Sequence, residues 1–171
     1  SEFDAGKTEY AKVPFSMRGF HRNGKKFAVA MKSKNFPSGL ERAEAEFSNI
    51  SAEGKFLYVL HFASGSADGE KIGTVEIFGE NGKKAEFAIE AGKSVFDYSR
   101  PSANAGCVSV SPWQKRGSIY AACVSKFPIP ENFGRIAKMA FAPDGAAAGT
   151  WIVLAANISE RDVAFPKEWN Y

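Results

Sequence analysis

One loop of the sequence sets an indole beside three hydrogen-bonding side chains. Trp113 lies between two apolar runs and is followed directly by Gln114, Lys115 and Arg116. A flat aromatic face can stack against the C–H face of a pyranose ring. The three neighbours can reach hydroxyl, carboxylate or sulfate groups, and arginine can do so in a bidentate manner. We therefore expect Trp113 to be a sugar-stacking platform with Gln114, Lys115 and Arg116 as polar contacts, or else a lid over the end of the core.

A second loop repeats this combination. Tyr98 follows Asp97 directly and lies two residues before Arg100. Tyr98 can stack on a sugar while Arg100 binds an anionic substituent, and a packed tyrosine with a hydrogen-bonded hydroxyl explains the same residues equally well. Phe36, in the loop 35–39, is a third aromatic candidate, although such a residue more often anchors its own loop to the core.

Catalytic chemistry has weaker support. His61 ends an apolar run, where a lone histidine is more often a hydrogen-bonded core residue, and no motif supplies a nucleophile or base for it. Hydrolysis of a glycosidic bond would need two carboxylates facing one site. The glutamates mostly alternate with apolar residues instead, which is typical of a solvated sheet face. They are Glu41, Glu44, Glu46, Glu76, Glu86 and Glu90.

No motif requires a cofactor. Cys107 and Cys123 lie on either side of a candidate turn at 115–118, so a disulfide is geometrically open to them, but buried free thiols fit their strand-like runs better. Neither cysteine has a second Cys or His at metal-ligand spacing, which argues against structural zinc. A few loop carboxylates offer oxygens to calcium, without the spacing of a dedicated calcium loop. These are Asp68, Glu70 and Asp144.

The elements that hold these residues are predicted to be β-strands. Across 73–90, apolar and charged residues alternate on both sides of Asn81-Gly82, with the period of a half-buried strand. Asn-Gly suits a two-residue turn in which both residues have positive φ. Similar short runs recur between turns with no convincing long helix, so we predict an all-β sandwich or barrel. The predicted strands are 10–16, 26–32, 56–62, 74–78, 85–90, 107–111, 118–125, 135–141 and 151–156, with 40–50 assigned to strand rather than helix on context.

The composition is that of one folded domain. The chain has 171 residues, of which 44% are hydrophobic and 13% aromatic, with a formal net charge of +3. Its cations are spread along the chain without a recognisable nucleic-acid-binding motif, so no nucleic-acid partner is expected. No apolar run approaches the roughly 20 residues that span a bilayer. We divide the chain into a cloning scar or linker at 1–9, a β-sandwich module at 10–159 and a tail or linker at 160–171, cut from a longer exported precursor.

Several short motifs occur in an order that resembles a known group of modules. The chain is similar to the galactose-binding-like β-sandwich modules of bacterial glycoside hydrolases and polysaccharide lyases, over about 14–159. Phe96 and Tyr98 depart from that pattern, in which tryptophan is common at these places. The resemblance implies a single antiparallel jelly-roll sandwich, frequent structural calcium and an accessory role. The motifs are 58–63, 71–73, Asn81-Gly82, 96–98, 127–130 and 134–136.

The sequence therefore predicts a non-catalytic carbohydrate-binding module of a multidomain carbohydrate-active enzyme, secreted, periplasmic or at the cell surface. Its expected partners are a polysaccharide or other glycan, acidic ones included, and a neighbouring catalytic domain of the parent chain. The alternative is a structural or protein-interaction spacer, which predicts that Trp113 and Tyr98 are buried. A small enzyme such as a lyase is the third reading, and it requires His61 and a tyrosine hydroxyl to converge in an open groove.

Overall fold

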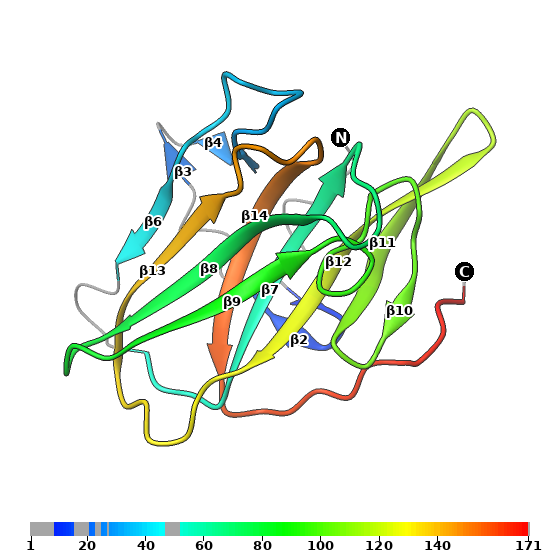
Figure 1. Cartoon of the computed structure of the whole chain (residues 1–171). Coiled ribbons are helices and arrows are strands. Elements are labelled where there is room, and N and C mark those ends of the chain that lie inside the picture. Colours follow the sequence, from blue (N-terminus) through cyan, green and yellow to red (C-terminus); the bar gives the residue numbers. More distant parts are fainter. Residues whose placement is uncertain (1–8, 16–20, 23–24, 27, 47–51, 171) are drawn as a thin grey trace.

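Two antiparallel β-sheets pack face to face in the computed structural model, which describes residues 9–15, 21–22, 25–26, 28–46 and 52–170 (Figure 1). The six-stranded sheet has the order β10 (Ala103–Asn104), β11 (Cys107–Lys115), β12 (Ser118–Pro128), β7 (Phe56–Ser64), β14 (Thr150–Ser159) and β5 (Val29–Ala30). The four-stranded sheet has the order β6 (Ala43–Glu46), β13 (Ile136–Pro143), β8 (Lys71–Gly79) and β9 (Lys84–Glu90). Two small hairpins complete the strands, β1 (Glu9–Tyr10) with β2 (Val13–Pro14) and β3 (His21–Arg22) with β4 (Lys25–Lys26). The predicted all-β sandwich is confirmed.

Alternation along the strands builds two apolar layers. Inward-facing side chains, including Trp151, Phe141 and Ile77, fill the space between the sheets. The opposite face of β7, where Tyr58 and Leu60 point, carries a second cluster. Each such side chain contributes about 1.5–3 kcal/mol when removed from water. The outer face of the six-stranded sheet is therefore a covered surface over part of its length, and the covering comes from both ends of the chain.

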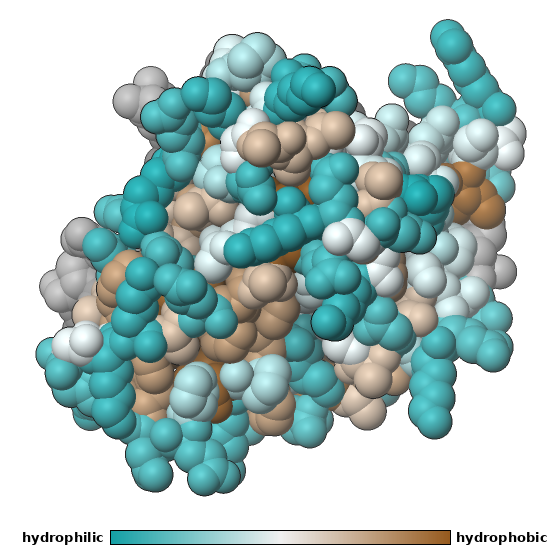
Figure 2. Space-filling model, viewed as in Figure 1, coloured by the Kyte–Doolittle hydropathy of each residue, from teal (hydrophilic) through white to brown (hydrophobic). Residues whose placement is uncertain are grey.

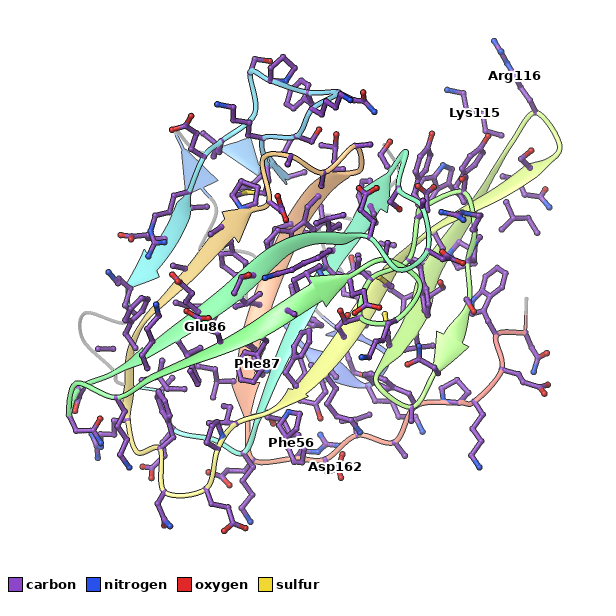
Figure 3. The ribbon with its side chains drawn as sticks, in the orientation of Figure 1. Phe56, Glu86, Phe87, Lys115, Arg116 and Asp162 are labelled. Atoms are coloured by element: carbon purple, nitrogen blue, oxygen red, sulfur yellow. The ribbon has the colours of Figure 1, made fainter. Side chains whose placement is uncertain are left out.

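The C-terminal tail supplies part of that cover. The Tyr58 hydroxyl donates to the carbonyl of Arg161 at 2.6 Å and accepts the amide of Val163 at 2.9 Å. Lys126 donates to the Asp162 carboxylate at 2.7 Å and to the Val163 carbonyl at 2.8 Å. Figure 3 shows the labelled Asp162 on the tail close to the lower edge of the sandwich. The segment predicted as a tail or linker thus lies against the sandwich.

The predicted strands of the sandwich centre are confirmed, and most of them extend further than the sequence suggested. The N-terminal ones are wrong in detail. Over residues 9–14 a tight hairpin replaces the strand predicted at 10–16, because Ala11 and Lys12 form its turn with φ of 52° and 61°, and residue 16 lies outside the described part. The strand predicted at 26–32 is interrupted between β4 and β5, and only 43–46 of the segment 40–50 is a described strand, residues 47–50 lying outside the described part.

The Asn81-Gly82 hairpin joins β8 to β9 as predicted, but its loop has another form. The strands end at Gly79 and resume at Lys84, so the loop spans 80–83. Gly82 has a φ of 82°, while Asn81 is not among the described residues of positive φ. The side chain of Asn81 instead accepts the Lys83 amide at 3.0 Å. The prediction of a two-residue turn with two positive φ values was therefore wrong.

No helix that could cross a membrane occurs within the described ranges.

Candidate functional site

Three aromatic side chains meet on the outer face of the six-stranded sheet, next to the β11–β12 turn. The ring centroids of Tyr98 and Tyr120 lie 5.1 Å apart, those of Trp113 and Tyr120 5.9 Å, and those of Tyr98 and Trp113 6.5 Å. Their planes are within 25° of one another. All three are partly exposed. We call Tyr98, Trp113 and Tyr120 the aromatic platform, and Phe62 adjoins it with its ring 6.0 Å from that of Tyr98.

A β-bulge aims Trp113. Val110 pairs with Ala122 and Trp113 pairs with Tyr120, so Ser111 and Pro112 together oppose one residue of β12. The extra residue restores Trp113 to the face that Tyr120 occupies. Ser111 adopts a φ of 48°, a left-handed conformation that costs an L-residue about 1–2 kcal/mol.

Tyr98 is placed by a segment wedged between two strands. β7 and β12 pair directly only up to His61, and beyond that point the segment 96–98 lies between them. The Tyr98 amide donates to Ala63 at 2.8 Å, and the Tyr98 carbonyl accepts from Ala121 at 2.9 Å. The backbone of Tyr98 is thus held on both sides, and its ring faces the same way as that of Tyr120.

Asp97 anchors the loops beside the platform. It is 5% exposed. One oxygen accepts the Ser66 amide at 3.0 Å and the other accepts the Ser99 amide at 3.1 Å and hydroxyl at 2.6 Å. Burial opposes ionisation of Asp97, but hydrogen bonds from Ser99 and Ser66 and the charge of Arg100 hold its pKa below the usual value. The carboxylate is therefore a fixed negative centre that orders the chain next to Tyr98.

Arg100 is used by the neighbouring loop. Its guanidinium donates to the Ser66 carbonyl and lies 3.4 Å from the Asp68 carboxylate. The side chain remains 48% exposed. The structure thus places Arg100 near the platform loops, but with its charge partly compensated.

The two cations at the hairpin tip are arranged differently. Arg116 and Gly117 form the turn with φ of 52° and 80°, between the paired residues Lys115 and Ser118. Figure 3 shows Lys115 and Arg116 extending from the tip away from the sandwich. Neither forms an ion pair with any described residue. Lys115 shares the strand face of Trp113, whereas the exposed Gln114 alternates to the opposite face.

The structure brings together Trp113 and Tyr98, which the sequence put in separate patches. Tyr120 was missed. The signal was available, because a turn at 115–118 sets the register of the hairpin and that register pairs position 113 with position 120.

His61 belongs to a buried hydrogen-bond chain. Trp151 donates its indole N–H to His61 Nδ1 at 2.9 Å, and His61 Nε2 lies 2.6 Å from Ser125 Oγ. An indole N–H only donates, so Nδ1 accepts, and the neutral ring donates from Nε2. His61 is 0% exposed. It therefore orders the core as predicted, and the open catalytic groove required for a lyase does not form around it.

Both cysteines are free and buried, as the sequence favoured. The Cys123 thiol lies 3.3 Å from the His61 carbonyl, and Cys107 lies across from Ser125 in the β11–β12 ladder. Burial raises the pKa of the Cys107 thiol. The protonated thiol is a poor nucleophile and metal ligand, which fits a packing role.

The strand glutamates form an ion-paired surface on the four-stranded sheet. Glu76 lies 3.0 Å from Arg42 and 3.1 Å from Lys84, and Lys84 also reaches Glu86 at 2.9 Å. Burial alone would raise the pKa of Glu76, but hydrogen bonds from Lys84 and Arg42 lower it. Figure 2 shows hydrophilic side chains over β6 and β13 on this side. Glu44, Glu76 and Glu86 thus have cationic partners on a sheet surface, and the side chain of Glu46 lies outside the described part of the chain.

The loop carboxylates proposed for calcium do not form a ligand set. Asp68 contacts Arg100, Glu70 accepts the Gly149 amide at 2.6 Å, and Asp144 accepts the Ala146 amide at 3.1 Å. In the described part of the chain, no three His, Cys, Asp or Glu side chains gather as metal ligands would.

Neither a family model nor a curated protein nor a solved structure matches the chain.

Proposed function

We propose that the chain is a non-catalytic carbohydrate-binding module that stacks sugar rings on Tyr98, Trp113 and Tyr120. The observation that carries this proposal is the partial exposure of three nearly parallel rings at one place on a sheet. Large aromatic side chains grouped at the surface leave apolar area in water unless a ligand covers it. A pyranose offers a C–H face of matching shape.

Acidic glycans are the favoured ligand class. Some cations of the sandwich, such as Arg42, Lys84 and Lys126, lie next to carboxylates. Lys115 and Arg116 form no ion pair with a described residue and extend from the strand pair that carries Trp113 and Tyr120. Uncompensated cations two or three residues from a stacking ring can contact a carboxylate or sulfate on the bound sugar.

The exposure of the platform favours this function over that of a structural or protein-interaction spacer. A spacer predicts buried rings, and both Trp113 and Tyr98 are partly exposed. The proposed function also assigns the chain to the galactose-binding-like jelly rolls of exported carbohydrate-active enzymes. A neighbouring catalytic domain in the same parent chain would then raise the effective concentration of a weakly bound glycan. Stacking and hydrogen bonding require no cofactor.

The test is an array of neutral and acidic polysaccharides probed with the wild-type chain and two platform variants, Trp113→Ala and Tyr120→Ala. Saturable binding that falls at least about tenfold in both variants supports the function, a loss of about 1.4 kcal/mol. Phe36→Ala is the matched control, because Phe36 is an exposed aromatic residue in the loop 35–39 and is not one of the three rings of the platform. Absence of glycan binding by the wild-type chain would instead favour the spacer.

A further inference from the structure

A groove lies between β11 and the C-terminal tail. It has a volume of about 390 Å³ and is open to solvent. Figure 1 shows the tail rising beside β10 and β11 on the right of the molecule. One wall is the part of β11 from Val108 to Pro112, and the other includes Trp169 and Glu168 of the tail. The lining residues are Ala11, Val108, Ser109, Val110, Ser111, Pro112, Pro166, Glu168, Trp169 and Asn170.

The groove opens on the face that carries the platform. Val108 and Val110 belong to the apolar cluster on the outer side of the six-stranded sheet, together with Ala122. Tyr120 lies two residues from Ala122 on β12 and so points to the same side. The bulge keeps Trp113 on that side as well. The groove and the platform are therefore consecutive along β11, with Pro112 lining the groove and Trp113 beginning the platform.

The tail wall is a built part of the fold. Tyr58 and Lys126 fix the tail at residues 161–163 through four hydrogen bonds of 2.6–2.9 Å. The Phe165 ring packs against Tyr58 with centroids 6.3 Å apart. The next residue, Pro166, has a restricted φ and begins the stretch that lines the groove. Trp169 thus lies at the groove in a tail that hydrogen bonds and ring packing hold against the sandwich.

We infer that this groove is a further sugar subsite continuous with the platform, and that the ligand is an internal stretch of a glycan chain rather than a single terminal sugar. The inference rests on the proposed function. The volume of the groove lies in the lower range of small-molecule sites. Its lining combines an indole with hydroxyl, amide and carboxylate groups that suit sugar hydroxyls. Glu168 disfavours an acidic group here, whereas Lys115 and Arg116 favour one at the other end. The bound glycan is therefore expected to carry its acidic substituent at the end near the hairpin tip.

Size-fractionated fragments of heparin and of polygalacturonate, from dimers to octamers, test this with the whole chain in isothermal titration calorimetry. Affinity for at least one series should rise about tenfold or more between dimer and hexamer. Trp169→Ala should remove that gain while leaving dimer binding unchanged, and Trp169→Phe should restore part of it. Asn170→Ala, at an exposed groove residue, is a second variant with little effect on folding, and unfolding curves verify that each variant is native.

The outcomes separate the two proposals. Binding that requires Trp113 but is equal for dimer and hexamer, or a length dependence that persists in both Trp169→Ala and Asn170→Ala, overturns the groove subsite and leaves the platform in place. No binding of any fragment by the wild-type chain overturns the acidic-glycan function together with the groove.

Discussion

Replacing Asp97 by asparagine tests whether one buried carboxylate fixes the loops that carry the platform. Its oxygens accept the backbone amides of Ser66 and Ser99, one on each side. An asparagine amide offers only one oxygen, so its NH₂ group must face one of these N–H donors. A buried amide left without an acceptor costs about 1–3 kcal/mol, and the lost charge assistance adds to it. We expect Asp97→Asn to lower the free energy of unfolding by about 2–3 kcal/mol.

The pH dependence gives the sharper assay. The pKa of Asp97 in the folded chain lies below the usual 3.8. The contribution of the ionised carboxylate to the free energy of unfolding is therefore complete above 3.8 and is lost as the pH falls through the folded-state pKa. Urea unfolding should therefore show a constant difference in the free energy of unfolding between the wild-type chain and Asp97→Asn from about pH 5 to 7, a range that begins about one unit above the usual pKa. This difference should shrink as the pH falls below that range. A stability loss below about 0.5 kcal/mol, or a gap that stays the same in acid, would refute this account of Asp97.

Three further substitutions probe the supports of the site. Ser111→Gly should raise Tm by about 2 °C in calorimetry, because glycine adopts the positive φ of the bulge without a Cβ clash, and a lowered Tm would contradict the strain assigned there. His61→Ala should cost about 3–5 kcal/mol in urea unfolding, because it leaves a cavity and removes the acceptor of the buried Trp151 indole N–H, while Ser125 keeps its bond to the Ser94 carbonyl. A loss under about 1 kcal/mol would show that the hydrogen bonds from Trp151 to Ser125 are dispensable. Lys126→Met should speed hydrogen exchange of tail amides while lowering global stability by about 1 kcal/mol or less, and unchanged exchange would mean that other contacts hold the tail.

The strands at the centre of the sandwich were predictable because the environment of each strand face determines whether its side chains are apolar or polar. In β8 the side chains alternate between the core and the outer surface, so a period of two is visible in the sequence. β7 is buried on both faces, and its short continuous apolar run is the other strand signal. The hairpin of β1 and β2 was not predictable, since its turn residues, Ala11 and Lys12, lack the Gly or Asn signature of positive φ.

The sequence could not show how tertiary pairing brings the candidate site residues together. The types of Trp113 and Tyr98 marked them as candidates, but their meeting depends on a wedge between β7 and β12 that no local pattern reveals. The bulge at Ser111 is also silent in the sequence, because a serine gives no sign of a left-handed conformation. Arg100 looked like a ligand contact by type, and its proximity to Asp68 became visible only in three dimensions.

The wedge and the bulge have a consequence for the entropy of binding. Tyr98 is held by hydrogen bonds on both sides of its backbone, and its ring packs against those of Phe62 and Tyr120. Rotamer freedom that a flexible loop would lose on contact with a ligand has already been lost when the chain folds. Such preorganisation removes about 0.5–1.5 kcal/mol of ordering cost for each side chain that would otherwise be immobilised. A ligand bound at the platform as proposed would therefore meet side chains that are already ordered.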